Sequence, residues 1–199
     1  REAIDPVRYL SNHSSGKMGY ALAQAAVEAG ARVILVSGPV ALNAPPGCER
    51  LSTQSAQQMH DAVMQRISEV DIFIGCAAVS DYRPAVCEDQ KIKKKDTSMQ
   101  IDLVKTKDIL ASLGAIKKDQ YLLGFALETQ NELENAKKKL DKKNLDAIVL
   151  NSLRDKGAGF QTKTNKITFI EKDGSVTEYD LKTKAEVSID IFDKIAEKI

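Results

Sequence analysis

The sequence predicts an α/β protein with a Rossmann-like, doubly wound and mainly parallel sheet, followed by a C-terminal β-hairpin and a closing helix. Three observations point to this class: apolar runs recur along the chain, amphipathic stretches separate them, and the last fifty residues change to alternating strands. We expect one domain over 1–199, with a nucleotide-binding α/β core at 1–151, a long loop at 80–98 and the hairpin with its helix at 152–199.

The predicted strands are short apolar runs, as expected of parallel strands covered on both faces. The first run, RVILVS (32–37), ends at Gly38-Pro39, which is a strong stop signal. The other runs are VDIFIGCAAV (70–79), YLLGFAL (121–127) and LDAIVLN (145–151).

The predicted helices lie between these runs, where apolar residues recur every three or four positions. Each strand–helix–strand unit is expected to cross over with a right hand, which stacks the strands into one open sheet. The helical segments are 18–29, 59–67, 109–116 and 133–140.

The C-terminal part has a different pattern. KITFIEKDGSVTEYDL (166–181) predicts a hairpin with a type I′ turn at Asp173-Gly174. A closing helix follows, in which Val187, Ile191, Ile195 and Ile199 are spaced by four residues.

Composition excludes several classes of protein. Lysine and arginine total 29 against 28 acidic residues, and this balance argues against a general nucleic-acid binder. No apolar run reaches the roughly 20 residues of a membrane helix, and the charged N-terminus is unlike a signal peptide. Cys48, Cys76 and Cys87 form no metal-binding spacing, so we expect no zinc site, no disulfide and a cytoplasmic location. The chain begins at Arg1 without a methionine, which we interpret as a fragment of a longer protein.

A serine- and glycine-rich loop precedes the first predicted helix. Ser14, Ser15, Gly16 and Lys17 lie where free backbone N–H groups and the positive end of the helix dipole favour an anion. The alternative is an ordinary helix start with Ser14 or Ser15 as the N-cap. A nicotinamide cofactor is disfavoured, because the strand at 32–37, which follows this loop and helix, ends at Ser37 without the acidic residue that holds the ribose.

The loop at 80–98 is the longest stretch without a regular pattern, and such loops are usually functional. Its lysines could close over a polyphosphate as a lid, whereas the lysines of the fourth helix are more simply a solvated face. The lysines of the loop are Lys91, Lys93, Lys94 and Lys95, and those of the fourth helix are Lys137, Lys138, Lys139, Lys142 and Lys143.

Two further residues were considered. Asp81 follows a strand end and is placed to accept ribose hydroxyls, or else to cap the loop. His60 lies within a predicted amphipathic helix and is expected at the surface.

Several motifs together resemble one family, the bacterial CTP-dependent phosphopantothenate–cysteine ligases of coenzyme A biosynthesis. The resemblance runs through essentially the whole chain. It is carried by NHSSGKMG (12–19), VSGPV (36–40), GCAAVSDYRP (75–84), KIKK (91–94), KDIL (107–110), GFALET (124–129) and KKNLD (142–146).

This resemblance implies a reaction and a set of site residues. The carboxylate of 4′-phosphopantothenate would attack the α-phosphate of CTP, and the amine of cysteine would then displace CMP. Asn12 would bind the acyl-cytidylate, Lys91 would come from a strap over the intermediate, and the loop at 14–17 would face phosphate. The CTP site would comprise Gly75, Cys76, Ala77, Asp81, Lys91, Lys107, Asp108, Ile109, Leu110, Phe125, Lys139 and Lys143.

The resemblance also implies cofactors and partners. Mg²⁺ would be carried by CTP without a dedicated protein cage. FMN would belong only to a fused decarboxylase half and not to this chain, and the ligase would be a homodimer. The family has a strand and a glycine-rich stretch before the residues matching Arg1, so we expect that first strand to be missing here. Lys107 stands where the family often has proline, and Ser152 stands where aspartate is common.

Two other functions are less favoured by the residues. A nicotinamide-dependent oxidoreductase lacks its ribose-binding acid. A non-catalytic nucleotide- or RNA-binding module lacks a stacking platform, because aromatic residues are only 5% of the chain.

Overall fold

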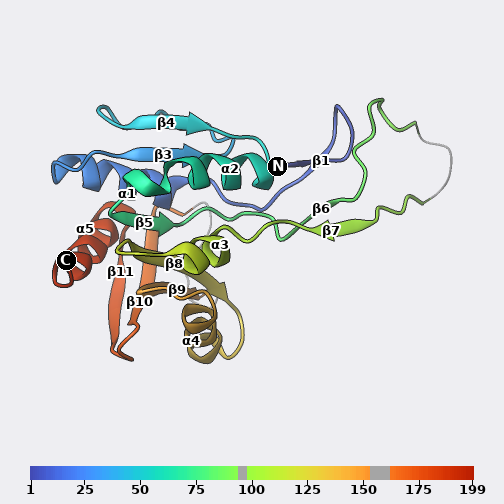
Figure 1. Cartoon of the computed structure of the whole chain (residues 1–199). Coiled ribbons are helices and arrows are strands. Elements are labelled where there is room, and N and C mark those ends of the chain that lie inside the picture. The colour runs from blue at the N-terminus through green and yellow to red at the C-terminus, as the bar shows by residue number, and fades with distance from the viewer. Residues whose placement is uncertain (94–97, 153–161) are drawn as a thin grey trace.

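A five-stranded mixed sheet forms the centre of the computed structural model, which describes residues 1–93, 98–152 and 162–199 (Figure 1). Three of its strands are parallel, and the C-terminal hairpin continues the sheet in antiparallel pairing. The strand order is β11-β10-β9-β8-β5. The bounds are β5 (Ile72–Gly75), β8 (Tyr121–Glu128), β9 (Ala147–Ser152), β10 (Thr164–Glu171) and β11 (Val176–Thr183).

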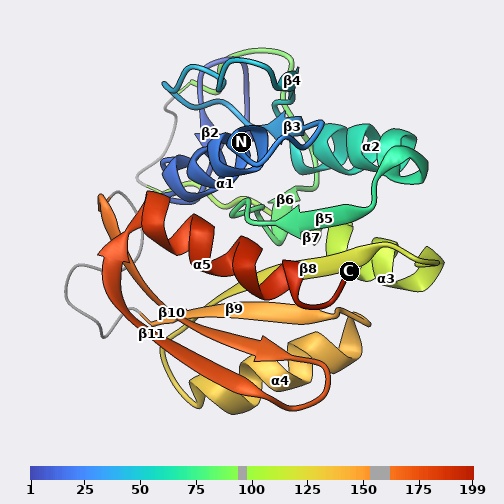
Figure 2. The ribbon, with the colours of Figure 1, turned by 90° about the vertical axis from the view of Figure 1, so that its left-hand side faces the viewer.

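Helices cover both faces of this sheet, which explains why its strands are continuous apolar runs (Figure 2). Successive residues of β8 enter different cores: Leu123 packs with α1 and α5, whereas Leu122 packs with α2, α3 and α4. The helices are α1 (Lys17–Glu28), α2 (Ala56–Arg66), α3 (Ile109–Ile116), α4 (Glu132–Lys142) and α5 (Lys184–Ala196), with the short 3-10 helix η1 (Ile67–Glu69) after α2.

The N-terminal strands form a separate pair. β3 (Ile34–Ser37) and β4 (Glu49–Ser52) are parallel, and in the described residues β3 pairs with β4 alone. The predicted α/β class is therefore confirmed, but the single open sheet is interrupted. A cavity of about 1060 Å³ borders both β3 and β5, so the two strand edges are too far apart to share hydrogen bonds.

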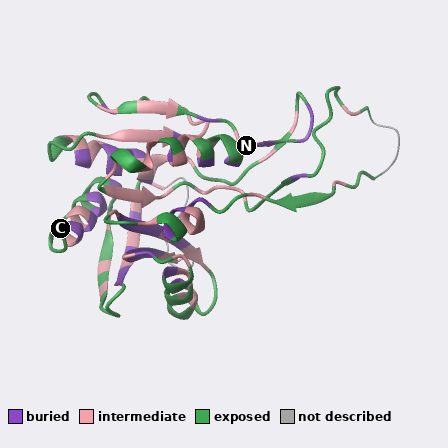
Figure 3. Ribbon diagram, viewed as in Figure 1, coloured by how far each residue is buried: buried purple, intermediate pink, exposed green. Residues whose placement is uncertain are grey.

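An arm projects from this body on the side where the parallel strands end (Figure 1). It contains two short antiparallel pairs, β1 (Glu2–Ala3) with β2 (Tyr9–Leu10), and β6 (Tyr82–Pro84) with β7 (Leu103–Lys105). Figure 3 shows that much of the arm is exposed. The loop predicted at 80–98 is thus built on a two-stranded ribbon, because 82–84 pairs with a segment twenty residues further on.

The C-terminal hairpin and helix are confirmed, with two corrections. The turn is not type I′, since only Gly174 has a positive φ (92°), and its N–H donates to Glu171 O, as in a type I turn followed by a bulge. Val187, Ile191 and Ile195 are fully buried, whereas Ile199 lies beyond α5 and is exposed. In the described parts of the chain, no helix is long and apolar enough to cross a membrane.

Candidate functional site

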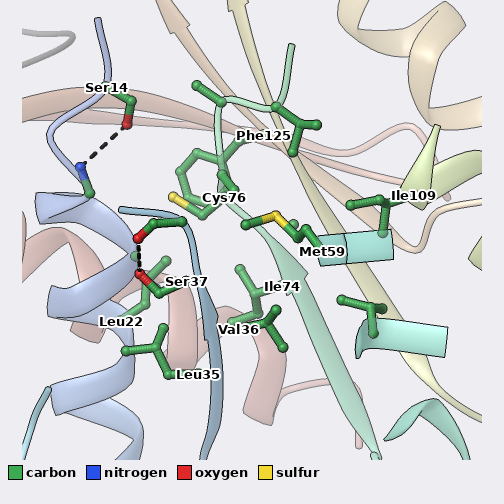
Figure 4. A pocket seen from close by; sticks show the side chains of 18 of the residues that line it. Ser14, Leu22, Leu35, Val36, Ser37, Met59, Ile74, Cys76, Ile109 and Phe125 are labelled. Atoms are coloured by element: carbon green, nitrogen blue, oxygen red, sulfur yellow. Dashed lines mark hydrogen bonds between the residues drawn. The ribbon is translucent and has the colours of Figure 1, made fainter. Parts of the chain in front are cut away.

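The cavity between β3 and β5 opens at the carboxyl ends of the parallel strands, where α/β proteins bind ligands. Its interior is apolar: Leu22 of α1, Val36 of β3 and Ile74 of β5 approach one another in Figure 4. Its mouth is polar and is formed by the loops that follow the strands. The cavity therefore has an apolar floor and an entrance lined by charged side chains.

The structure brings the sequence-predicted residues together. They come from separate segments of the chain, and all of them except Lys91 border the cavity. Those residues are Asn12, Ser14, Ser15, Gly16, Lys17, Gly75, Cys76, Ala77, Asp81, Lys107, Asp108, Ile109, Leu110, Phe125, Lys139 and Lys143.

The serine- and glycine-rich loop starts α1 in a way that favours an anion. Gly16, not a serine, is the N-cap, with a φ of 76°, and in the described part of the chain no side chain caps this helix start. The Gly16 N–H donates to Ser14 Oγ at 3.3 Å. A Cβ at Gly16 would lie 3.0 Å from Val40 Cγ1, so both backbone conformation and space require glycine here. The uncapped first turn leaves its N–H groups for a ligand.

Asn12 is bonded to the segment that follows β5. Its Nδ2 donates to Ala78 O at 3.0 Å and to Val79 O at 3.3 Å. Asp81 follows on the same segment and is exposed. Both residues border the cavity, so both are available to a ligand that enters it.

Two lysines of the α4 segment reach the cavity through ion pairs. Lys143 Nζ lies 2.8 Å from Asp108 Oδ2, and Lys139 Nζ lies 3.4 Å from Glu128 Oε1. Burial raises the pKa of Asp108, but the Lys143 ammonium and the Ala111 N–H outweigh burial, and the net pKa is lowered. Asp108 therefore stays ionised, caps α3 and holds Lys143 in place.

Glu128 is a residue that the sequence analysis missed. The signal was its place at the end of β8, within the GFALET motif, where carboxylates face the ligand-binding edge of the sheet.

The end of β5 is tightly packed. A Cβ at Gly75 would lie 2.9 Å from Leu110 Cδ2, so this glycine allows α3 to pack closely on the strand. Burial raises the pKa of the Cys76 thiol to about 12, so the thiol stays protonated near neutral pH. A protonated thiol is a poor nucleophile, so Cys76 is not suited to covalent catalysis.

Lys91 lies on the arm and is exposed. Its neighbour Ile92 is anchored within the arm to the turn between β1 and β2: the Ile92 N–H donates to Asp5 Oδ2 at 3.1 Å, and Arg8 Nη2 donates to Ile92 O at 3.0 Å. Asp5 is buried and also pairs with the Arg8 guanidinium. Lys94 and Lys95 lie outside the described residues.

His60 is buried, which corrects the prediction that it lies at the surface. Its Nδ1 is 3.0 Å from Asp61 Oδ1, and its Nε2 is 3.3 Å from Ser112 Oγ on α3. The polar sequence around His60 gave no sign of this contact, because burial arises from the packing of α2 against α3.

Comparisons with known proteins agree with this fold. Residues 1–199 match the family model of the DNA/pantothenate metabolism flavoprotein C-terminal domain. The chain is 51% identical over 197 residues to the coenzyme A biosynthesis bifunctional protein CoaBC of Bacillus subtilis, covering 98% of this chain and 48% of that protein. It thus spans about half the length of the curated relatives it matches.

Solved structures show the same fold. The crystal structure of the C-terminal domain of a CoaBC protein has a TM-score of 0.84 and 46% identity, covering 98% of this chain and 88% of that one. A Cab2 mutant in complex with phosphopantothenate-cysteine has a TM-score of 0.75 and 16% identity, covering 98% and 84% of the two chains. The chain belongs to the DNA/pantothenate metabolism flavoprotein C-terminal domain family.

Proposed function

We propose that this chain is a phosphopantothenate–cysteine ligase driven by CTP, which forms 4′-phosphopantothenoyl-L-cysteine, CMP and pyrophosphate. The observation that carries the proposal is the convergence of the predicted nucleotide-binding residues, Lys91 excepted, on one cavity at the carboxyl ends of the strands. The name of the CoaBC relatives and the ligand of the Cab2 complex support the substrate class.

The first step activates a carboxylate. A carboxylate oxygen of 4′-phosphopantothenate attacks the α-phosphorus of CTP, and the bond to the bridging oxygen breaks so that pyrophosphate leaves with the electron pair. The chain's own cations act on the charge that builds on this leaving group: Lys17 and the uncapped start of α1 on one side, and Lys139 and Lys143 on the other. The carboxylates of Glu128 and Asp108 form ion pairs with Lys139 and Lys143 and keep both ammonium groups at the cavity.

The second step forms the amide. The amine of cysteine attacks the acyl carbon of phosphopantothenoyl-CMP, CMP leaves, and the amine loses a proton. In this proposal Asn12 contacts the reacting centre through its Oδ1, because its Nδ2 donates to Ala78 O and Val79 O.

Magnesium enters with the nucleotide in this proposal. The described residues contain no group of three or more histidine, cysteine or acidic side chains that could hold a metal ion. The carboxylate of Asp81, which borders the cavity, fits one contact to a cation whose other ligands are phosphate oxygens and water. Bound in this way, Mg²⁺ would offset phosphate charge.

The test measures pyrophosphate release from CTP in the presence of Mg²⁺, 4′-phosphopantothenate and cysteine, using this chain and the full-length protein. We expect release with CTP and little with ATP. No release from the full-length protein, or equal release with ATP, contradicts the proposal.

Asn12→Asp separates the two half-reactions. The added negative charge is expected to leave pyrophosphate release measurable while phosphopantothenoylcysteine formation falls by at least tenfold. Ser11→Asp is the matched control, because Ser11 is an exposed neighbour whose Oγ bonds only weakly to Asn12 O at 3.4 Å. Equal survival of both half-reactions in Asn12→Asp excludes the proposed role.

We also propose that the enzyme is a cytoplasmic homodimer whose arm contacts the second copy. Val86, Tyr82, Leu103 and Val104 of the arm are exposed apolar residues, and such clusters mark protein interfaces. Lys91 does not border the cavity of its own chain, so in a dimer it would serve the partner's cavity.

Mixing two inactive variants tests this arrangement. Lys91→Ala and Asn12→Asp are each expected to lose ligation, and their mixture is expected to recover up to about a quarter of the activity, since one site of a mixed dimer is intact. A mixture as inactive as its parents, or a monomeric mass in solution, overturns the dimer proposal.

A further inference from the structure

A series of polar contacts joins α2 to the first turn of α3. It begins at His60 in the middle of α2, which is 9% exposed. The His60 Nδ1 is 3.0 Å from Asp61 Oδ1, and the Nε2 is 3.3 Å from Ser112 Oγ. Ser112 Oγ also lies 2.8 Å from the backbone O of Asp108, which is the N-cap of α3. A buried side chain of α2 is therefore linked to the residue at which α3 begins.

Asp61 directs the His60 ring toward α3. Hydrogen bonds from His60 and Gln57 lower the pKa of Asp61, so this carboxylate is ionised near neutral pH. An ionised carboxylate only accepts hydrogen bonds, so the His60 Nδ1 carries a proton toward it. The Nε2 then accepts the Ser112 O–H when the ring is neutral and donates to Ser112 Oγ when the ring is protonated. The contact between His60 and α3 therefore exists in both protonation states.

The helix α3 depends on its neighbours for its position. It has eight residues (Ile109–Ile116), and a helix of about two turns is marginal on its own. On one side, Gly75 lets it approach the end of β5 closely. On another side, Asn144 Nδ2 donates to Gly114 O at 3.1 Å. His60 adds a polar contact from a third element, α2.

The first turn of α3 carries groups of the candidate nucleotide site. Asp108 Oδ1 accepts the Ala111 N–H at 3.0 Å, and Asp108 Oδ2 lies 2.8 Å from Lys143 Nζ. Lys107, which borders the cavity, lies close enough to Asp61 for its charge to lower the pKa of that carboxyl. A shift of this turn moves Asp108, and the Lys143 ammonium then loses the partner that holds it at the cavity.

We propose that His60 is a positioning residue for binding of the nucleoside triphosphate. Through Ser112 it holds the first turn of α3, and this turn keeps Asp108 and Lys143 in place. The inference rests on the proposed function, because that function assigns Lys143 to the nucleotide. It gives α2 a part in nucleotide binding through a side chain that does not itself border the cavity.

The test measures binding of CTP with Mg²⁺ to the whole chain by calorimetry. His60→Phe keeps a ring in the same place and removes the bond to Ser112. We expect CTP to bind about 3- to 10-fold more weakly, which corresponds to the loss of one hydrogen bond. His60→Gln places an amide near the position of Nε2, so its affinity is expected to stay within twofold of the wild type.

Met64→Ala is the matched control for a general loss of stability. Met64 lies one turn further along α2 and packs against the same core, and it does not border the cavity. Met64→Ala is expected to lower the melting temperature and to leave CTP affinity unchanged. If it weakens CTP binding as much as His60→Phe does, the positioning role is excluded.

A double-mutant cycle shows whether His60 acts through Lys143. In a Lys143→Ala background, the addition of His60→Phe is expected to weaken CTP binding by less than twofold, because the positioned ammonium is already gone. An equal loss from His60→Phe in both backgrounds overturns the proposal.

Hydrogen exchange without nucleotide separates this inference from the proposed function. The backbone N–H groups of Ala111 and Ser112, which bond to Asp108, are expected to exchange faster in His60→Phe than in the wild type or Met64→Ala. A wild-type chain that binds no CTP contradicts the proposed function, and exchange then still shows whether His60 holds α3. Unchanged exchange in His60→Phe overturns the inference, whatever the chain binds.

Discussion

The two halves of the molecule are packed to different extents. In the C-terminal half, strands β8, β9 and β10 have helices or strands on every side, and residues such as Leu123, Val149 and Phe169 are fully buried. In the N-terminal half, Ile34, Leu35 and Val36 of β3 are only half-buried, although they are equally apolar.

The difference is due to the cavity and not to composition. The facing edges of β3 and β5 both border it, and neither strand pairs across it in the described residues. An apolar strand thus stays only half-buried where its edge borders a cavity and not another strand.

Truncation of core residues tests the difference in packing directly. Ile191→Ala removes a fully buried side chain between α5 and the sheet, and we expect a loss of about 3–4 kcal/mol. Ile74→Ala removes the same atoms from a half-buried residue beside the cavity, so the loss should be about 1 kcal/mol. Urea denaturation measures both, and equal losses would contradict the comparison.

Gly114→Ala tests the contact between α3 and the segment after α4. A Cβ there would lie 1.9 Å from the backbone O of Lys143, so the two segments must separate. We expect a loss of roughly 2 kcal/mol from overpacking and weaker CTP binding, because Lys143 moves with its backbone. Gly19→Ala is the control: a Cβ meets nothing within 4 Å, and alanine in this helix should stabilise by about 0.5–1 kcal/mol. If the Gly114→Ala variant is destabilised but binds CTP normally, the contact between α3 and Lys143 does not position the CTP site.

Acid should loosen the arm before it affects the packed half. The Arg8 guanidinium lowers the pKa of Asp5 well below its usual range, and the N–H groups of Val7, Arg8 and Ile92 act in the same direction. Because the folded-state pKa lies below the unfolded value of about 3.9, this carboxylate stabilises the fold above that pH, and the contribution is lost as pH falls further. Proteolysis of the arm between pH 6 and pH 3 measures the effect. Asp5→Asn should be cleaved rapidly even at pH 6, and cleavage at the wild-type rate would contradict this anchoring role.

The sequence predicted the long elements well and the short ones poorly. The runs at 121–127 and 145–151 differ from β8 and β9 by at most two residues at either end, because fully buried strands must be apolar throughout. The pairs β1–β2 and β6–β7 contain two or three residues per strand and show no periodicity, so only tertiary contacts define them.

The candidate site was likewise predictable only where regular elements place its residues. Motif residues were identified from the ends of strands, where the fold itself gathers ligand-binding groups. The ion pairs of Glu128 and Asp108, the burial of His60 and the place of Lys91 on the arm depend on how helices and ribbons meet. No local pattern in the sequence predicts these contacts between elements.

The hairpin and the last helix also influence the order of folding. β10, β11 and α5 are consecutive in the chain and contact one another, so this unit closes short loops and should form quickly. It leaves the ribosome after the rest of this domain, while Met18 and Leu22 of α1 need α5 to complete their core. We therefore expect this domain to acquire stable structure only after α5 has been synthesised.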